Sequence, residues 1–259
     1  MPNALLAVEH LDVRFGSAAA VRDLSFTIAK GESVGLVGES GSGKSVTAFS
    51  ILRLLQPPGR VTNGRVIFEG RDLLSLPERE MRTVRGARIA LIFQEPMTAL
   101  NPVMRVGDQI AEALIVHGQA SPSEGRARAE ELLDAVRIPD AARRIRDYPH
   151  QLSGGMRQRV MIAIALACQP PLIIADEPTT ALDVTIQAQV LELLRDLQAR
   201  YHLALLLITH DFGVIAEMAN RVAVMFKGRL VEQGPVRDIL RQPAHEYTRS
   251  LLAAVPGMR

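Results

Sequence analysis

Hydrophobic and polar residues alternate in short runs near the start of the chain. The stretches Leu6–Phe15 and Val21–Ile28 follow this period of two, which is typical of half-buried strands. Lys30-Gly31-Glu32 indicates a turn, and the apolar run Ser33–Val37 after it predicts a buried strand. Two further strands are predicted at Gly64–Phe68 and Ile89–Phe93.

The pattern changes to helical periodicity between Val106 and Asp147. Apolar residues there lie on one helical face and then on another, namely Val106, Ile110, Ala113 and Leu114, followed by Leu132, Leu133 and Val136. Strands alternate with helices again from Leu172–Ala175, through a helix at Ile186–Tyr201, to Leu203–Thr209. This order predicts an α/β core with a parallel sheet and crossover helices, interrupted by a helical insertion.

A glycine-rich loop follows the predicted strand Ser33–Val37, and it reads Gly38-Glu39-Ser40-Gly41-Ser42-Gly43-Lys44-Ser45. It matches the phosphate-binding pattern G-x-x-x-x-G-K-[ST], and a helix is predicted after it, from Val46 to Leu55. Glycines let successive backbone N–H groups point at phosphate oxygens, and the helix N-terminus adds its positive end. Lys44 supplies a charge for the outer phosphates, and the Ser45 hydroxyl can bind Mg²⁺. A chance Gly/Ser-rich loop is the alternative, but strand, loop, lysine and helix together favour nucleotide binding.

Two carboxylates, Asp176 and Glu177, end the apolar run that begins at Pro171. Successive strand residues point in opposite directions, so the two side chains cannot do the same work. Asp176 suits the coordination shell of Mg²⁺, and Glu177 is placed to polarise an attacking water as a general base. The alternative interpretation is an acidic turn that caps the next element.

The segment Ser153-Gly154-Gly155 precedes a helix predicted from Met156 to Cys168. A serine and two glycines at a helix start form a second place where an anion can bind. Two such places in one ATPase suggest a dimer that holds nucleotide between the loop of one subunit and this segment of the other. Taken alone, the segment is also compatible with an ordinary helix cap.

These motifs occur in one order with Gln94, Leu152–Gln158, Ala181-Leu182-Asp183 and His210, and the ordered set resembles the ATPases of ABC transporters. The resemblance implies an α/β fold, with a P-loop NTPase core, an N-terminal antiparallel β subdomain and an inserted α-helical subdomain. It implies one domain over residues 1–259. Residues 1–95 and 160–240 are then the nucleotide-binding core, 96–159 the helical subdomain and 241–259 a C-terminal tail.

The resemblance also implies roles for individual residues. Gln94 joins the shell of magnesium and water, Asp183 shapes the dimer interface, and His210 contacts the γ-phosphate. ATP contacts are expected at Phe15, Gly38, Glu39, Ser40, Gly41, Ser42, Gly43, Lys44, Ser45, Val46, Gln94, Ser153, Gly154, Gly155 and Asp183. Magnesium ligands are expected at Ser45, Gln94 and Asp176, and catalytic groups at Lys44, Glu177 and His210.

Two of these assignments have structural alternatives. Phe15 stands where the family stacks an aromatic ring, more often tyrosine, on adenine, but a phenylalanine that belongs to the core is a rival interpretation. His210 follows a strand and is also compatible with a residue that caps the helix beginning near Asp211.

Three segments resemble the ATPases of oligopeptide, dipeptide and nickel importers, namely Phe93–Pro102, Tyr148–Arg159 and His245–Leu252. Glu246 replaces the proline that is usual in the last of them. The resemblance implies a subunit that hydrolyses ATP to energise import of di- or oligopeptides. A nickel or metal-chelate importer and a soluble ABC ATPase without transport are the alternatives. The chain lacks the cysteine-bearing extension common in the peptide branch, which leaves a short nickel-type subunit, a trimmed chain and a naturally short peptide-type subunit open.

The loop Gln94–Pro102 is expected to help form a groove for a short helix of a membrane subunit. Apolar surface for this contact is predicted at Met97, Leu100, Val103 and Met104, which are equally compatible with a core position. The expected partners are two transmembrane permease subunits, a second and distinct ATPase subunit and, indirectly, an extracytoplasmic solute-binding protein.

Composition narrows the class further. The net charge is +2, which gives no reason to expect a nucleic-acid partner. Cys168 is the single cysteine, which excludes an internal disulfide framework, and its apolar surroundings predict a buried thiol. No run approaches the roughly 18 apolar residues of a membrane span, and no secretory signal is recognisable. We therefore expect a cytoplasmic protein, and the family resemblance implies that partners hold it peripherally at the cytoplasmic face of the inner membrane.

Overall fold

The computed structural model describes residues 4–180 and 182–253. These residues form two compact units. The first contains the described residues up to Met81 and those from Ala204 onward, and the second contains residues 82–203. Helix α2 (Glu78–Val84) contains the first boundary. The finer division expected from the sequence stays a prediction.

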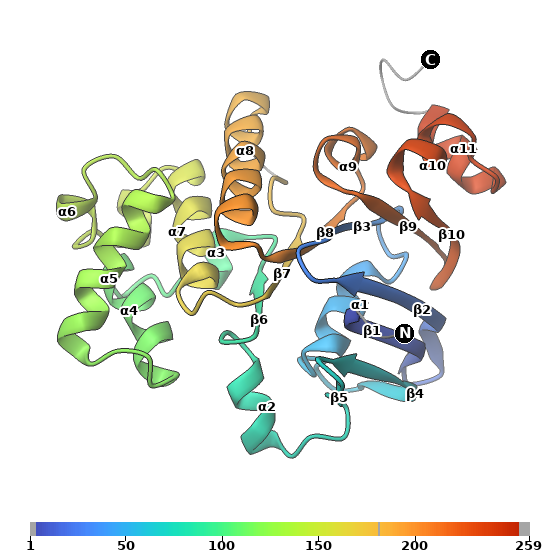
Figure 1. The fold of residues 1–259 in the computed structure, drawn as a ribbon, viewed down its shortest axis with the longest axis horizontal. Helices are drawn as coiled ribbons and strands as arrows, with labels where there is room; N and C mark the ends of the chain where they lie inside the picture. The colour runs from blue at the N-terminus through green and yellow to red at the C-terminus, as the bar shows by residue number, and fades with distance from the viewer. Residues whose placement is uncertain (1–3, 181, 254–259) are drawn as a thin grey trace. The chain divides into compact units, whose positions relative to one another are not determined.

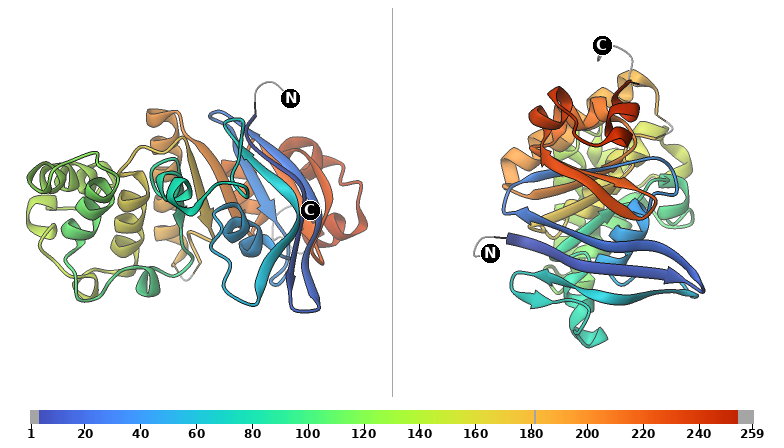
Figure 2. Two further views of the ribbon diagram at one scale, coloured as in Figure 1. Left: turned by 90° about the horizontal axis from the view of Figure 1, so that it is seen from below. Right: turned by 90° about the vertical axis from the view of Figure 1, so that its right-hand side faces the viewer.

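An antiparallel sheet opens the first unit, as the family resemblance implies (Figure 1). Its strands are β1 (Ala4–Phe15), β2 (Ala18–Ala29), β4 (Gly59–Phe68) and β5 (Arg71–Asp72), in the order β2-β1-β4-β5. Figure 2 shows β1, β2 and β4 as long neighbouring strands. Helix α1 (Lys44–Ile51) contacts all three of these strands.

A second group of strands in the first unit contains three parallel strands and one antiparallel strand. Strand β3 (Ser33–Val37) lies between β8 (Ala204–Thr209) and β9 (Arg221–Phe226), and β10 (Arg229–Pro235) pairs antiparallel with β9. Every residue of β3 and β8 is buried, which explains their continuous apolar sequences. Helix α9 (Phe212–Met218) packs on β3 and β8, and α10 (Val236–Arg241) packs on β9 and β10. Helix α11 (Glu246–Ala253) is the last described element.

The register of these strands sets the place of the phosphate loop. Val37 pairs with Thr209 of β8 and with Val224 of β9, so the loop leaves the sheet at the carboxyl end of β3. Ligands of open α/β sheets bind at this edge.

The second unit contains two parallel strands and most of the helices. Strand β6 (Ile89–Ile92) pairs with β7 (Leu172–Asp176) so that Ile92 lies opposite Ala175. The helical elements are α3 (Pro96–Ala99), α4 (Val106–Val116), α5 (Pro122–Ala135), α6 (Ala141–Arg144), a 3₁₀ turn (Pro149–Gln151), α7 (Gly154–Leu166) and α8 (Val184–Tyr201). Helices α4, α5 and α7 contact one another, which gives the apolar faces predicted between Val106 and Asp147 a common core.

The α/β fold class is confirmed, and several predicted helix boundaries are corrected. Helix α1 ends at Ile51 instead of Leu55, because Arg53 adopts a left-handed backbone with a φ of 54° that a helix cannot continue through. Helix α7 begins at Gly154 instead of Met156, because the Ser153 side chain caps it. None of the described helices is both long and apolar enough to span a membrane.

Candidate functional site

The predicted site residues divide between the two units. Phe15, the loop from Gly38 to Val46 and His210 belong to the first unit, and the others belong to the second.

Glycines let the phosphate loop run close to neighbouring backbone. A Cβ on Gly38, whose φ is 154°, would lie 2.2 Å from the carbonyl oxygen of Met225. A Cβ on Gly43, whose φ is 105°, would lie 2.7 Å from the carbonyl oxygen of Ala20. Any larger residue at these two positions would push the loop out of place.

Lys44 folds back over this loop. Its side chain is only 5% exposed, and Nζ donates hydrogen bonds to the carbonyl oxygens of Gly38 (2.6 Å) and Glu39 (2.9 Å). The ammonium group therefore lies within the curve of the loop, where phosphate oxygens would approach it. Ser45 is half-buried and is the second residue of α1, directly after Lys44.

The loop also fits a phosphate group by its hydrogen-bonding capacity. Among the described residues, the Ser42 hydroxyl is buried and has no hydrogen-bond partner. A buried hydroxyl without a partner is unfavourable, and a phosphate oxygen would supply the missing acceptor. Ser42 is thus suited to the predicted role in binding ATP.

His210 directly follows strand β8, and Phe15 is the last residue of strand β1. His210 is exposed and follows Thr209, the residue paired with Val37 immediately before the loop. Asp211, and not His210, caps helix α9, because its carboxylate accepts the N–H groups of Gly213 (2.7 Å) and Val214 (3.4 Å). The capping alternative for His210 is therefore wrong. Phe15 is half-buried, and the edge of its ring lies against Gly59.

In the second unit, the structure joins Gln94 to Glu177. Gln94 Nε2 donates to Glu177 Oε2 at 3.1 Å, and the Thr180 hydroxyl donates to the same oxygen at 2.9 Å. Glu177 is half-buried and has a φ of 46°, an unfavourable value for a residue with a side chain. Such strained positions concentrate at functional sites. Asp176, the last residue of β7, is 4% exposed.

The N-terminus of α7 lies close to α8. Ser153 caps α7 by accepting the Met156 N–H at 3.3 Å. A Cβ on Gly155 would lie 2.6 Å from Cγ2 of Ile186, whereas among the described residues a Cβ on Gly154 would meet only Leu182, at 3.9 Å. The second glycine is thus required by packing, and the first leaves the exposed end of the helix open to a ligand. Asp183 caps α8 by accepting the Ile186 N–H at 2.9 Å, and Ala181 lies outside the described residues.

The predicted docking residues divide into surface and core. Met97 is 54% exposed and Val103 is 83% exposed, as the docking hypothesis requires. Leu100 is only 3% exposed, so its assignment to the surface is wrong. Its apolar side chain closes the core at the end of α3, where its N–H bonds to the carbonyl oxygen of Pro96.

Sequence reasoning missed Ile115 and Val116, which are 37% and 72% exposed at the end of α4. They line a hollow between α4 and α5 of about 550 Å³, together with Met104, Asp108, Ala111, Glu112, Pro122, Ser123 and Arg126. Both residues depart from the apolar face that Val106, Ile110 and Leu114 bury. Apolar residues outside a helical face are the signal that would have indicated a second surface.

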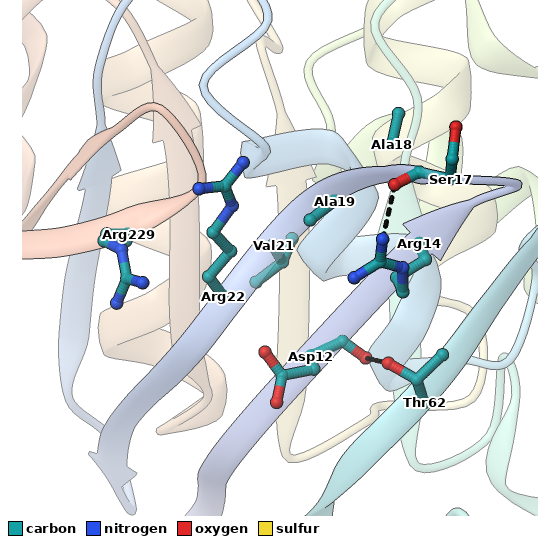
Figure 3. A pocket seen from close by; sticks show the side chains of 9 residues that line it. All are labelled: Asp12, Arg14, Ser17, Ala18, Ala19, Val21, Arg22, Thr62 and Arg229. Carbon is teal, nitrogen blue, oxygen red and sulfur yellow. Dashed lines mark hydrogen bonds between the residues drawn. The ribbon is translucent and has the colours of Figure 1, made fainter.

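A separate hollow of about 530 Å³ lies beside the turn that follows Phe15 (Figure 3). It is lined by three arginines and one acidic residue among smaller side chains: Asp12, Arg14, Ser17, Ala18, Ala19, Val21, Arg22, Thr62 and Arg229. Arg14 donates a hydrogen bond to the Ser17 carbonyl oxygen across the turn. None of the predicted nucleotide-binding residues lines this hollow.

Comparison with known proteins decides the family. The family model described as ABC transporter matches residues 21–180. The oligopeptide transport ATP-binding protein OppD of Salmonella typhimurium is 52% identical over 260 residues, which cover 99% of this chain and 77% of that protein. The chain belongs to the ABC transporter family. The chain is an ATP-hydrolysing subunit of this family.

A second curated relative and a solved structure support the same family for this ABC transporter ATPase. The dipeptide transport ATP-binding protein DppD of Bacillus subtilis is 52% identical over 259 residues, which cover 98% of this chain and 77% of that protein. A solved dimeric structure of the ATP-binding cassette MJ0796, in a post-hydrolysis state with ADP and Pi, is 30% identical with a TM-score of 0.79. That match covers 90% of this chain and 99% of the other.

Proposed function

We propose that this ABC transporter ATPase energises the import of di- or oligopeptides by binding and hydrolysing ATP. The contact between Gln94 and Glu177 carries the proposal, because it joins the loop expected to form the groove for the membrane subunit to the expected general base. The two relatives named for oligopeptide and dipeptide transport favour peptides over nickel as the solute.

The described residues supply distinct parts of the reaction. Lys44, Ser42 and the loop glycines are suited to hold and neutralise the phosphates, and Glu177 is suited to accept the proton of an attacking water. Mg²⁺ takes few protein ligands and completes its coordination shell with phosphate and water oxygens. The Ser45 hydroxyl, the Gln94 amide and the Asp176 carboxylate are the oxygen-bearing groups that would bind it. His210 is proposed to contact the γ-phosphate, and Phe15 to stack on adenine.

A second ATPase subunit completes the site in this proposal. The exposed Ser153 and Gly154 at the start of α7 are suited to bind the phosphates of a nucleotide held by the other subunit. The MJ0796 cassette, which this chain resembles, was solved as a dimer. We propose that the second subunit is a distinct homologue.

A permease helix is proposed to dock on the second unit. Met97 and Val103 are exposed near the hollow-lining Met104, and the apolar side chains of Ile115 and Val116 extend the surface. Two permease subunits would hold the protein at the cytoplasmic face of the inner membrane, with a solute-binding protein on the other side. Capture of the chain from its native membrane tests this arrangement. Two permeases and a distinct ATPase should accompany it, and a complex with copies of this chain alone would contradict the heteromeric arrangement.

Uptake by cells tests the function. A strain that lacks the chain should lose uptake of a labelled tripeptide, regain it with the wild-type chain, and fail to regain it with Glu177→Gln. Uptake of labelled nickel should be the same in all strains. Loss of nickel uptake with normal peptide uptake would establish the alternative solute, and unchanged uptake of both would refute the proposal.

A further inference from the structure

The C-terminal segment His245–Thr248 contains the start of helix α11. In the structure, this segment folds back onto the phosphate loop. The Glu39 backbone N–H donates a hydrogen bond to the Tyr247 hydroxyl at 2.9 Å, across 208 residues of sequence. Both residues belong to the first unit.

Both backbone polar groups of Glu39 are hydrogen-bonded. Its N–H is bound by Tyr247, and its carbonyl oxygen accepts hydrogen bonds from Lys44 Nζ (2.9 Å) and from the Ser42 N–H (3.1 Å). Glu39 therefore links the Tyr247 hydroxyl, through two hydrogen bonds, to the Lys44 ammonium group that is expected to contact the phosphates. Movement of Glu39 would move an anchor of Lys44.

Tyr247 itself is fixed in place. Its side chain is 8% exposed, and its ring packs on that of Phe226 with 4.1 Å between centroids. Burial raises the pKa of the Tyr247 hydroxyl, which keeps it protonated at neutral pH. Phe226 ends β9 directly before the turn at Lys227 and Gly228, and the Gly228 N–H donates to the Ser42 carbonyl oxygen at 3.0 Å. The aromatic pair thus packs beside a turn that also supports the loop.

The start of α11 is anchored separately from the loop. The Glu232 carboxylate accepts the N–H groups of Ala244 (2.7 Å) and His245 (3.0 Å). Burial works to raise the pKa of this carboxyl, but the Thr248 hydroxyl and then these two bonds outweigh it and hold the pKa below its usual value. His245 Nδ1 accepts the Tyr247 N–H at 3.1 Å. The helix therefore has its own attachment to β10, and the hydroxyl contact to Glu39 is not needed to hold it there.

We propose that Tyr247 is a positioning residue for ATP binding, whose hydroxyl holds Glu39 and thereby keeps the phosphate loop and Lys44 in the binding conformation. The inference rests on the proposed role of this loop in binding ATP. A loop that is ordered in advance loses less conformational freedom when the ligand binds, so its affinity is higher. The C-terminal segment is in this way coupled to nucleotide affinity.

Removal of the hydroxyl tests the proposal on the full-length chain. Tyr247→Phe keeps the ring on Phe226 and removes only the acceptor. We expect the Kd for ATP to rise about 2- to 12-fold, the ratio that corresponds to the net worth of one hydrogen bond, with kcat within about twofold. Tyr201→Phe, which removes a hydroxyl from α8 in the second unit, should change neither constant.

Amide hydrogen exchange without nucleotide gives a direct readout of the contact. In Tyr247→Phe, the Glu39 amide should exchange faster while amides of β9 and α11 keep their wild-type rates. An unchanged Kd together with unchanged exchange at Glu39 would overturn the proposal. Faster exchange throughout α11 and β9 with a lowered Tm would also overturn it, because Tyr247 would then serve only stability. A wild-type chain that binds no ATP would contradict the proposed function, while the exchange result would still decide whether the Tyr247 hydroxyl holds Glu39.

Discussion

Two apolar residues of one short segment, Leu100 and Val103, should respond differently to the introduction of a charge. Leu100 is 3% exposed and Val103 is 83% exposed, although both are apolar and lie three residues apart. Leu100→Asp removes an apolar side chain from the core, which is worth about 2–5 kcal/mol by itself. A carboxylate left without a partner in that environment adds a further penalty. We therefore expect the free energy of unfolding to fall by at least about 3 kcal/mol, a large part of the roughly 5–15 kcal/mol that is typical of a folded protein.

Val103→Asp places the same carboxylate in water. Its effect on the free energy of unfolding should stay within about 0.5 kcal/mol, as is usual for surface substitutions. In the membrane complex it should nevertheless lower solute-stimulated ATP hydrolysis and leave basal hydrolysis unchanged, because the charge would meet the docked permease helix.

Urea unfolding of the two variants checks the first part, and ATP hydrolysis with and without solute in the reconstituted complex checks the second. If Leu100→Asp kept the wild-type unfolding midpoint and lost only stimulated hydrolysis, the burial of Leu100 would be refuted. If Val103→Asp kept full stimulation, the docking surface would lie elsewhere.

Three further outcomes follow from the geometry. Gly155→Ala should lower the free energy of unfolding by about 1–3 kcal/mol through the overlap with Ile186, whereas Gly154→Ala should leave it nearly unchanged; equal urea midpoints would contradict this packing. Phe15→Ala should weaken ATP binding by about 1–3 kcal/mol in calorimetry, the value of base stacking in nucleic-acid proteins, while Phe15→Tyr retains it; unchanged affinity in Phe15→Ala would favour the core alternative. Burial raises the pKa of the Cys168 thiol, so at a given pH less reactive thiolate is present, and labelling by a thiol reagent should be slower and begin at higher pH in the folded chain than in urea; equal rates would contradict the burial.

Local pattern was sufficient for the features that depend on neighbouring residues. The alternation in Leu6–Phe15 and the apolar run in Ser33–Val37 predicted β1 and β3, because a strand's two faces are set by its own sequence. The phosphate loop was predictable because its glycines, lysine and hydroxyl are consecutive in sequence.

Features that depend on distant partners were not predictable in the same way. The burial of Leu100 depends on the core that α3 joins, and nothing in its neighbours distinguishes it from Met97 or Val103. The bond between Tyr247 and Glu39 joins residues that only the fold brings together. The early end of α1 follows from the left-handed backbone of Arg53, a conformation that an arginine in the sequence does not predict.

The general base is the part of the account that one measurement tests most directly. Wild-type protein and Glu177→Gln should be compared in the reconstituted complex for both ATP affinity and the rate of phosphate release. The account predicts that Glu177→Gln binds ATP with nearly the wild-type Kd and releases phosphate about 10²–10⁴-fold more slowly, the usual effect of losing a general base. A turnover close to that of the wild type would contradict the assignment of Glu177 and with it the proposed route of hydrolysis.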